Sequence, residues 1–292
     1  MSEAIKQTTT AAEDYAYSTP LEDLDVSNPN LWPNEDFWPI FERLRNEAPV
    51  HKCSNPWESP SRPEGARGVG SYWSVTRYED IMAIDTNHKV FSSEPIIVLP
   101  DPDEDFTLPM FIAMDQPKHD IQRKTVAPVV SPQNLQRMSH LIRERTCSVL
   151  DTLPINEEFD WVDTVSIELT TMMLATLFDF PFEERRKLTR WSDVATASPE
   201  TGIIESEDQR RAELYECLEY FTDLWNQKVN AEPDFDLISM LAHGEDTRNM
   251  DPLEYLGNLI LLIVGGNDTT RKSMPASIFS TNLFPTAWDK LK

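Results

Sequence analysis

The stretch LILLIVGGNDTTRKSM, residues 259 to 274, is the feature that most constrains the fold of this chain. It begins as an apolar helix and continues without a break into two glycines, an asparagine, an aspartate and two threonines. Glycine costs a helix interior about 1 kcal/mol relative to alanine, and Asn, Asp and Thr favour caps and turns over helix interiors. The sequence therefore predicts a buried helix that is locally weakened at Gly265 and Gly266.

Apolar spacing and prolines divide the rest of the chain into mainly helical segments. A helix over 37–47, a strand in SYWSVT and a short helix over 78–84 predict a small sheet-containing lobe near the N-terminus, and the acidic, proline-rich stretch from Ile96 to Phe111 predicts a loop. Further helices are expected over 118–129, 133–150, 161–178, 183–196, 207–229, 235–243 and 252–272. Pro275 falls where the last of these helices should continue, and a proline inside a helix costs about 3 kcal/mol.

Charge and cysteine usage exclude several classes of protein. A net charge of −24 repels nucleic acid and anionic membranes, and it serves either solubility or attraction of a cationic partner. The three cysteines are far apart and form no CxxC pair, so neither a zinc site nor a disulfide framework is indicated. The N-terminus lacks the apolar core of a secretory signal, and the longest apolar run, Leu259 to Val264, is too short to span a membrane. We expect a soluble cytoplasmic protein.

The string GGNDTT has two physical interpretations. Glycines in a helix either let a ligand approach the backbone closely or allow tight packing of a second helix. The Thr269 hydroxyl can bond back to the carbonyl of Gly265, four residues earlier, which competes with the helical hydrogen bonds. With Asp268 beside it, such an opening suits a small polar molecule and its protons.

Residues Gly265 to Thr270 resemble the oxygen-binding motif of the cytochrome P-450 family, the haem-thiolate monooxygenases, in which Ala or Gly is followed by Gly, any residue, Asp or Glu, Thr, and Thr or Ser. In that family a long central helix crosses the distal face of the haem. The resemblance implies that Gly265, Gly266 and Thr270 line an oxygen-binding groove. It further implies that Thr269 hydrogen-bonds dioxygen and that Asp268 relays protons.

A second string, MDQPKHDIQRKTVAPVVSP at residues 114 to 132, resembles the family segment that contacts the haem propionates. His119 and Arg123 are four residues apart and share one face of a helix, where Arg can bind a carboxylate through two hydrogen bonds. Gln116 replaces the usual proline of the family. The stretch YWSVTRYEDIMAIDTNHKVFSSE, residues 72 to 94, resembles the early strand, short helix and Phe-Ser-Ser of the family, so the resemblance extends over about residues 30 to 274.

Within the family, LLIVGGNDTTR, FSSEPIIVLPDPDED and MDQPKHDIQRK are most similar to soluble bacterial enzymes that hydroxylate the terminal carbon of medium-chain alkanes. An alkane pocket needs apolar walls with few hydrogen-bonding groups. The candidates are Ile96, Ile97, Val98 and Leu99 in the loop and Leu261 and Val264 on the central helix, and plain core packing is the alternative for each.

The cysteine thiolate that binds haem iron in this family lies in a Phe-x-x-Gly-x-x-x-Cys-x-Gly loop, and none of Cys53, Cys147 and Cys217 has that context. The resemblance therefore implies a cytochrome P-450 fold, mainly α with a small β-sheet lobe, that is truncated before the haem-ligand loop. We expect a flexible leader over residues 1–30 and an incomplete single domain over 31–292, with a sheet lobe at about 45–100 and a helical body at about 118–292.

The resemblance implies a monooxygenase that uses haem b and inserts one oxygen atom from O₂ into a C–H bond of an alkane or fatty acid. Electrons would come from NAD(P)H through a reductase and an iron–sulfur ferredoxin, for which Arg123, Lys124 and Arg137 could form a local basic patch. We expect this segment alone to fold poorly and to be inactive. The alternative is a non-catalytic helical remnant or binding protein without haem-thiolate chemistry.

Overall fold

The computed structural model describes residues 10–32, 35–54, 56–57, 70–99 and 106–291. It divides into two compact units, one formed by residues 1–107 and 113–115 and the other by residues 108–112 and 116–292.

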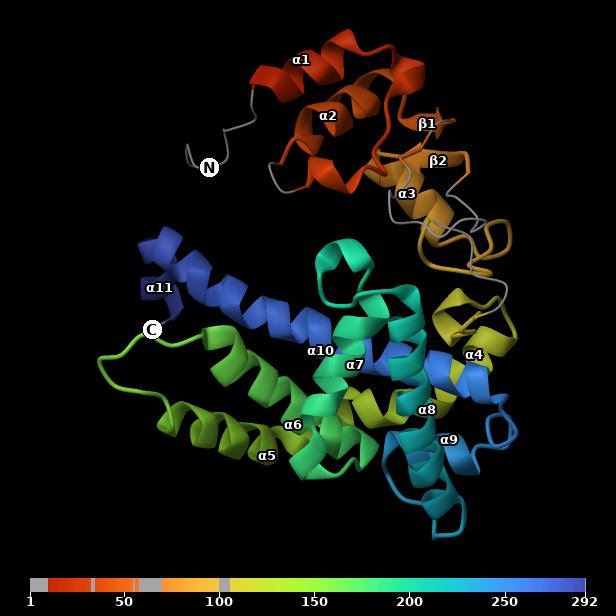
Figure 1. Ribbon diagram of the computed structural model, residues 1–292, viewed down its shortest axis with the longest axis vertical. Coiled ribbons are helices and arrows are strands. Elements are labelled where there is room, and N and C mark those ends of the chain that lie inside the picture. Colours follow the sequence, from red (N-terminus) through yellow and green to blue (C-terminus); the bar gives the residue numbers. More distant parts are fainter. Residues whose placement is uncertain (1–9, 33–34, 55, 58–69, 100–105, 292) are drawn as a thin grey trace. The chain divides into compact units, whose positions relative to one another are not determined.

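The first unit contains three helices and a two-stranded sheet within its described residues (Figure 1). The elements are α1 (Thr10–Ser18), α2 (Phe37–Glu47), β1 (Val50–Cys53), β2 (Tyr72–Val75) and α3 (Tyr78–Asp85). The strands are antiparallel, with His51 opposite Ser74 and Cys53 opposite Tyr72. The expected helix over 37–47, the strand in SYWSVT and the small sheet are confirmed.

The core of the first unit forms where α1 packs on α2. Ile40 and Leu44, one turn apart on α2, are fully buried with Ala16 and Leu24. The Asp25 carboxylate then fixes the following segment to the sheet, because it accepts hydrogen bonds from the Tyr72 hydroxyl at 2.8 Å and from backbone and hydroxyl donors nearby. Burial opposes its ionisation, but these hydrogen bonds outweigh burial and lower the pKa of Asp25.

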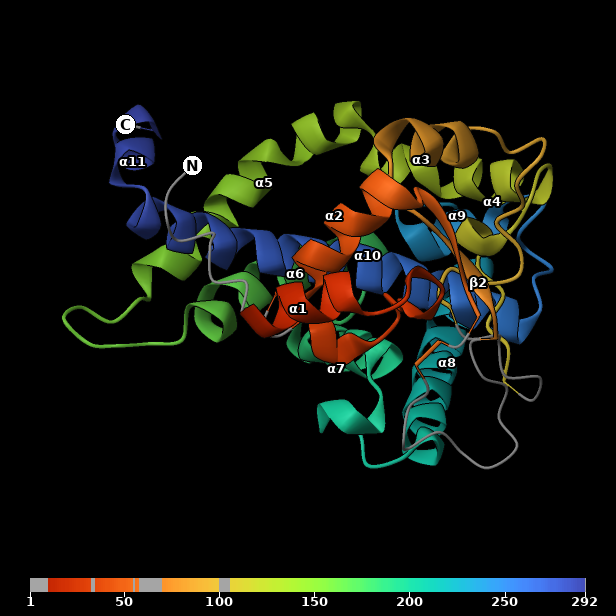
Figure 2. The same cartoon turned by 90° about the horizontal axis from the view of Figure 1, so that it is seen from above.

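In the second unit all regular secondary structure among the described residues is helical (Figures 1 and 2). Its helices are α4 (Lys118–Val126), α5 (Pro132–Asp151), α6 (Glu168–Phe178), α7 (Arg186–Thr196), α8 (Glu207–Val229), α9 (Leu237–His243), α10 (Pro252–Leu283) and α11 (Pro285–Leu291), and a π-helical turn over Val162–Ile167 leads into α6. Every helix expected from the sequence in this region is present, and apart from the C-terminal end of α10 each lies within a few residues of its predicted ends. The mainly α fold with a small sheet is thereby confirmed.

Aromatic packing joins α6, α7 and α8. The fully buried side chains of Phe178, Trp191 and Phe221 lie in one cluster with Phe180, and the Phe180 and Phe221 ring centroids are 5.5 Å apart. α10 passes beside this cluster and contacts α6 and α7, as both views of the ribbon show (Figures 1 and 2). The core of the unit therefore supports α10 on α6 and α7.

The expected end of the central helix near residue 272 is wrong. α10 runs without interruption through Pro275 to Leu283, and α11 follows directly. The proline removes one hydrogen-bond donor and crowds the preceding turn, but continuous helix on both sides holds its backbone in helical conformation. None of the described helices combines the length and apolar character needed to cross a membrane.

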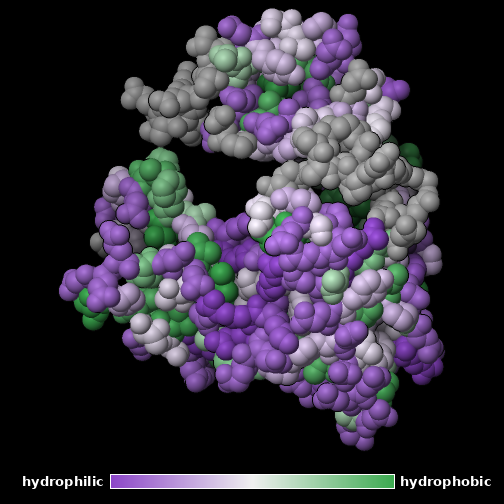
Figure 3. Space-filling model, viewed as in Figure 1, coloured by the Kyte–Doolittle hydropathy of each residue, from purple (hydrophilic) through white to green (hydrophobic). Residues whose placement is uncertain are grey.

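The surface of the second unit is largely hydrophilic on the face drawn in Figure 3, in keeping with the net charge of −24. Hydrophobic side chains gather at the end formed by the last turns of α10 and by α11 (Figure 3). The exposed large hydrophobic side chains at this end are Ile278, Phe279, Leu283, Phe284 and Trp288.

Candidate functional site

The helix α10 carries the motif at its middle. It starts with Asp251 as N-cap, whose carboxylate accepts a hydrogen bond from the backbone N–H of Leu253 at 2.9 Å, and with Pro252 at its first position. The next two turns are almost entirely buried, and exposure increases from Gly265 onward. The motif thus lies where α10 leaves the core.

The two glycines have different surroundings. A methyl group added at Gly266 would lie 2.6 Å from Cδ2 of the buried Leu174 on α6, so this glycine is needed for helix packing. A methyl group added at Gly265 would meet no atom within 4 Å, so its Cα faces open space. Of the two interpretations of the pair, close packing applies to Gly266, and the open approach to the backbone applies to Gly265.

Thr269 lies one turn after Gly265 on the same side of α10. Its hydroxyl donates a hydrogen bond to the carbonyl of Gly265 at 2.9 Å, as expected from the sequence, and its side chain is exposed. α10 nevertheless remains continuously helical here, so the weakened point is not a break in the helix. A hydroxyl and an open backbone surface are therefore presented together. Thr270, the following residue, is also exposed.

Asp268 is held in a network between α10 and α7. Its Oδ1 accepts hydrogen bonds from Arg271 Nη2 at 2.6 Å and from Ser192 Oγ at 3.3 Å. Arg271 also binds Asp193 of α7 at 2.7 Å, and Lys272 Nζ lies 3.4 Å from Asp268 Oδ2. The Asp268 side chain is only 15% exposed, so its negative charge is balanced mainly by protein groups instead of water.

The two residues expected to bind haem propionates lie on α4. The His119 side chain is partly exposed; its Nδ1 lies 2.9 Å from Asp120 Oδ1, and its ring centroid lies 6.4 Å from that of Phe111. Arg123 is exposed, and its guanidinium makes no hydrogen bond or ion pair with any residue that the structure describes. Four residues apart, the two side chains share a face of the helix.

Gln122 and Asn258 connect α4 to α10, a link that sequence reasoning missed. Asn258 Nδ2 donates to Gln122 Oε1 at 3.0 Å, and Asn258 Oδ1 accepts from the backbone N–H of Phe111 at 2.8 Å. Both side chains are buried. The signal was present as an amide within the apolar run LGNLILL, because a buried amide has to find hydrogen-bond partners. This link fixes the helix that carries Arg123 to the helix that carries the motif.

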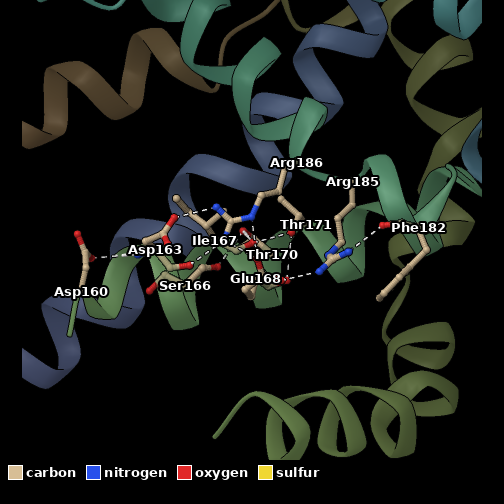
Figure 4. A network of polar contacts seen from close by, with 10 residues as sticks. All are labelled: Asp160, Asp163, Ser166, Ile167, Glu168, Thr170, Thr171, Phe182, Arg185 and Arg186. Atoms are coloured by element: carbon tan, nitrogen blue, oxygen red, sulfur yellow. Dashed lines mark hydrogen bonds and ion pairs between the residues drawn. The ribbon is translucent and has the colours of Figure 1, made fainter. Parts of the chain in front are cut away.

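A cluster of charged residues on α6 and α7 was also missed (Figure 4). Glu168 accepts hydrogen bonds from Arg185 Nη2 and Arg186 Nε, both at 2.8 Å, and Arg186 also binds Asp163 at 2.8 Å. Burial opposes ionisation of Glu168, but the two arginines outweigh it and lower its pKa. The sequence signal was the adjacent pair of arginines, Arg185 and Arg186.

The six expected substrate contacts divide between the two units. Ile97, Val98 and Leu99 are exposed and Ile96 is partly buried, all in the first unit. Leu261 and Val264 are partly buried on α10 in the second unit. No group of three or more His, Cys, Asp or Glu side chains suited to a metal ion occurs among the described residues. Cys53 and Cys217 are buried, and Cys147 is exposed.

No protein-family model matches the chain, but comparisons with individual proteins are informative. Linalool 8-monooxygenase from Pseudomonas putida is 28% identical over 284 residues, which cover 93% of this chain and 67% of that protein. The solved structure of CYP153D17 from Sphingomonas sp. PAMC 26605 is 47% identical with a TM-score of 0.77, covering 91% of this chain and 65% of that one. The chain belongs to the cytochrome P450 family. A second cytochrome P450, P450-153 from Novosphingobium aromaticivorans, is 42% identical with the same TM-score.

The cytochrome P450 fold expected from the sequence is thus confirmed, and the named homologues are monooxygenases. The P450 chain spans between 58% and 67% of the length of the first two curated relatives it matches. The helix α10 with its motif and the helix α4 with His119 and Arg123 both lie within this P450 segment.

Proposed function

We propose that the protein containing this chain is a haem-dependent monooxygenase that inserts one oxygen atom from O₂ into a C–H bond of an alkane or fatty acid, at the terminal carbon. The observation that carries the proposal is the exposed side of α10, where the open backbone at Gly265 lies beside the Thr269 hydroxyl with Asp268 adjacent. A binding protein that lacks oxygen chemistry has no need of this combination.

The residues of the second unit fit haem b. Arg123 has its guanidinium free of partners among the described residues, and its planar fork matches a propionate carboxylate. His119 can donate from Nε2 to a second carboxylate oxygen while Nδ1 faces Asp120. Gly265 offers a surface without a side chain to a flat ligand. When bound, the haem supplies the iron at which O₂ is activated.

Proton delivery is the role that we propose for the motif side chains. The Thr269 hydroxyl can turn its proton from the Gly265 carbonyl toward dioxygen in the groove, since both acceptors would lie on the open side of α10. Asp268 has a hydrogen-bond contact to the Ser192 hydroxyl, through which a proton at its carboxylate can be replaced, while Arg271 holds that carboxylate in place. Thr270, which is exposed next to Thr269, is a further proposed oxygen-site residue, whereas Gly266, expected from the sequence to line the groove, faces Leu174 of α6.

Apolar substrates suit the side chains proposed to contact them. Leu261 and Val264 on α10 offer hydrocarbon surfaces, and the loop residues Ile96–Leu99 are proposed as contacts because they form an apolar run. The named relatives favour the same class: a linalool 8-monooxygenase and, at 25% identity, a steroid C26-monooxygenase from Mycolicibacterium smegmatis. Both names describe oxidation of one carbon of a largely apolar molecule.

The proposed electron donors are an iron–sulfur ferredoxin and its NAD(P)H reductase. Lys124 and Arg137 are exposed on α4 and α5, and with Arg123 they offer positive charge to an acidic ferredoxin on a chain that is otherwise strongly acidic. We propose a cytoplasmic location, because the three cysteines lie far apart in the sequence with no CxxC pair, a usage that suits a reducing compartment.

The test is the origin of the oxygen in the product. The full-length protein, reconstituted with haem, ferredoxin, reductase and NAD(P)H, is supplied with a medium-chain alkane or fatty acid under ¹⁸O₂. The proposal expects a terminal alcohol that carries one ¹⁸O atom. Absence of product with haem bound, or an alcohol labelled only from H₂¹⁸O, would contradict it and favour a helical protein without this chemistry.

A further inference from the structure

Asn267, the variable position of the motif, is fully buried on α10. Its Oδ1 accepts a hydrogen bond from the Thr170 hydroxyl on α6 at 3.0 Å. The neighbouring Gly266 packs against Leu174, four residues after Thr170 and therefore on the same face of α6. Positions 266 and 267 thus attach the motif to α6, whereas positions 265 and 269 lie on the exposed side.

The polar groups around this attachment are crowded and incompletely satisfied. Thr170 Oγ1 also lies 2.9 Å from the carbonyl of Ser166, at the end of the π-helical turn that precedes α6 (Figure 4). A hydroxyl has one proton, so Thr170 cannot donate to this carbonyl and to Asn267 at the same time. If the Asn267 amide is rotated by 180°, its Nδ2 donates a hydrogen bond to Thr170 Oγ1. The Thr170 hydroxyl then donates its own proton to the carbonyl of Ser166. In either orientation the amide and the hydroxyl remain joined.

Such an arrangement contributes little to net stability. Asn267 Nδ2 and Ser166 Oγ are buried and have no hydrogen-bond partner among the described residues, and each such unsatisfied group destabilises the fold. Two apolar side chains of similar size would pack here at least as stably. The polar pair instead specifies the orientation of α10. Its hydrogen bond has good geometry at only one rotation of α10 about the helix axis, whereas apolar contacts are compatible with several.

We propose that Asn267 is a positioning residue: its hydrogen bond to Thr170 fixes the rotation of α10 so that Gly265 and Thr269 face the groove. The inference rests on the proposed function for the roles of those two residues. The attachment itself concerns only α6 and α10 and can be measured without oxygen chemistry.

The experiment compares N267L, T170V, the double variant and T170S in the full-length haem-loaded protein. One readout is hydrogen exchange of the backbone amides of residues 265–270, and the other is the amount of product formed per NAD(P)H consumed. N267L and T170V each leave a buried group without its partner, so each should lower exchange protection about tenfold and also lower coupling. T170S keeps the hydroxyl and should match the parent in both readouts.

The double variant separates positioning from packing. With both polar partners gone, its melting temperature should return toward that of the parent, because no new unsatisfied group remains. Its coupling should stay as low as in the single variants. Recovery of coupling together with stability would show that only packing matters and would overturn the proposal, as would single variants that lose coupling with unchanged exchange.

Failure of the proposed function has a different signature. If the parent binds haem but forms no product, the monooxygenase assignment fails. The exchange data still decide whether Asn267 orders the motif: unchanged protection in N267L and T170V would overturn the positioning role.

Discussion

Substituting alanine for each motif glycine in turn should give stability changes of opposite sign. At Gly265 the new methyl group meets nothing within 4 Å, so Gly265→Ala gains only helix propensity and should stabilise the fold by about 1 kcal/mol. At Gly266 the same gain is opposed by the contact with Leu174 Cδ2, 2.6 Å from the new carbon. Leu174 is almost completely buried, so moving it disturbs the core.

Overpacking of a core typically costs about 1–3 kcal/mol. After the propensity gain of about 1 kcal/mol, Gly266→Ala should change the free energy of unfolding by between about zero and 2 kcal/mol in the destabilising direction. The two variants should therefore differ by about 1–3 kcal/mol. Urea denaturation of both variants and the parent at one pH measures this difference directly.

Repeating Gly266→Ala in a Leu174→Val variant tests whether Leu174 causes this difference in stability. Leu174→Val removes the Cδ2 atom that the methyl group would approach, so in this background Gly266→Ala should become stabilising by about 1 kcal/mol. If Gly266→Ala stabilises the protein as much as Gly265→Ala while Leu174 is intact, the assignment of Gly266 to helix packing is refuted.

Two further predictions concern Glu168 and Pro275. The pKa of Glu168 is lowered by Arg185 and Arg186, so its contribution to stability is present above the unfolded-state pKa of about 4.3 and is lost as the pH falls through the lower folded-state value. Glu168→Gln should therefore be less stable than the parent at pH 7 and approach it in acid, and a gap that stays constant in denaturation at several pH values would contradict this. Because α10 is helical on both sides of the proline, Pro275→Ala should raise the free energy of unfolding by up to about 3 kcal/mol. An unchanged free energy of unfolding would contradict this and favour a helix that ends near residue 272.

The helices of the second unit followed from apolar spacing because that spacing reflects burial, which dominates helix stability in proteins. The extension of α10 beyond Pro275 could not be foreseen, because an intrinsic propensity says nothing of the turns that hold a proline in place. The π-helical turn over Val162–Ile167 was missed for a similar reason: its sequence has ordinary helical spacing.

The residues of the candidate site could be predicted from the sequence motif, but their spatial neighbours could not. The Thr269 hydrogen bond follows from sequence spacing alone, since a hydroxyl in a helix reaches the carbonyl four residues earlier. Gly266 packs against Leu174, which is distant in the sequence, whereas Gly265 has no such neighbour. The apolar periodicity of the helix cannot distinguish the two glycines. The partners of Asn267 and Asn258 are equally distant, so only the folded chain shows that these amides attach α10 to α6 and α4.

The most direct test of the central claim compares Thr269→Ala with Ser277→Ala in the full-length haem-loaded protein. Ser277 is an exposed hydroxyl on the same helix with the same kind of bond, to the carbonyl of Ser273 at 2.8 Å, and it lies outside the motif. The assay measures product and hydrogen peroxide formed per NAD(P)H consumed. Thr269→Ala should lower the product ratio and raise the peroxide ratio, with Ser277→Ala at the parent values. Parent-like coupling in Thr269→Ala, or an equal loss in Ser277→Ala, would contradict the assignment of α10 as the oxygen-handling helix.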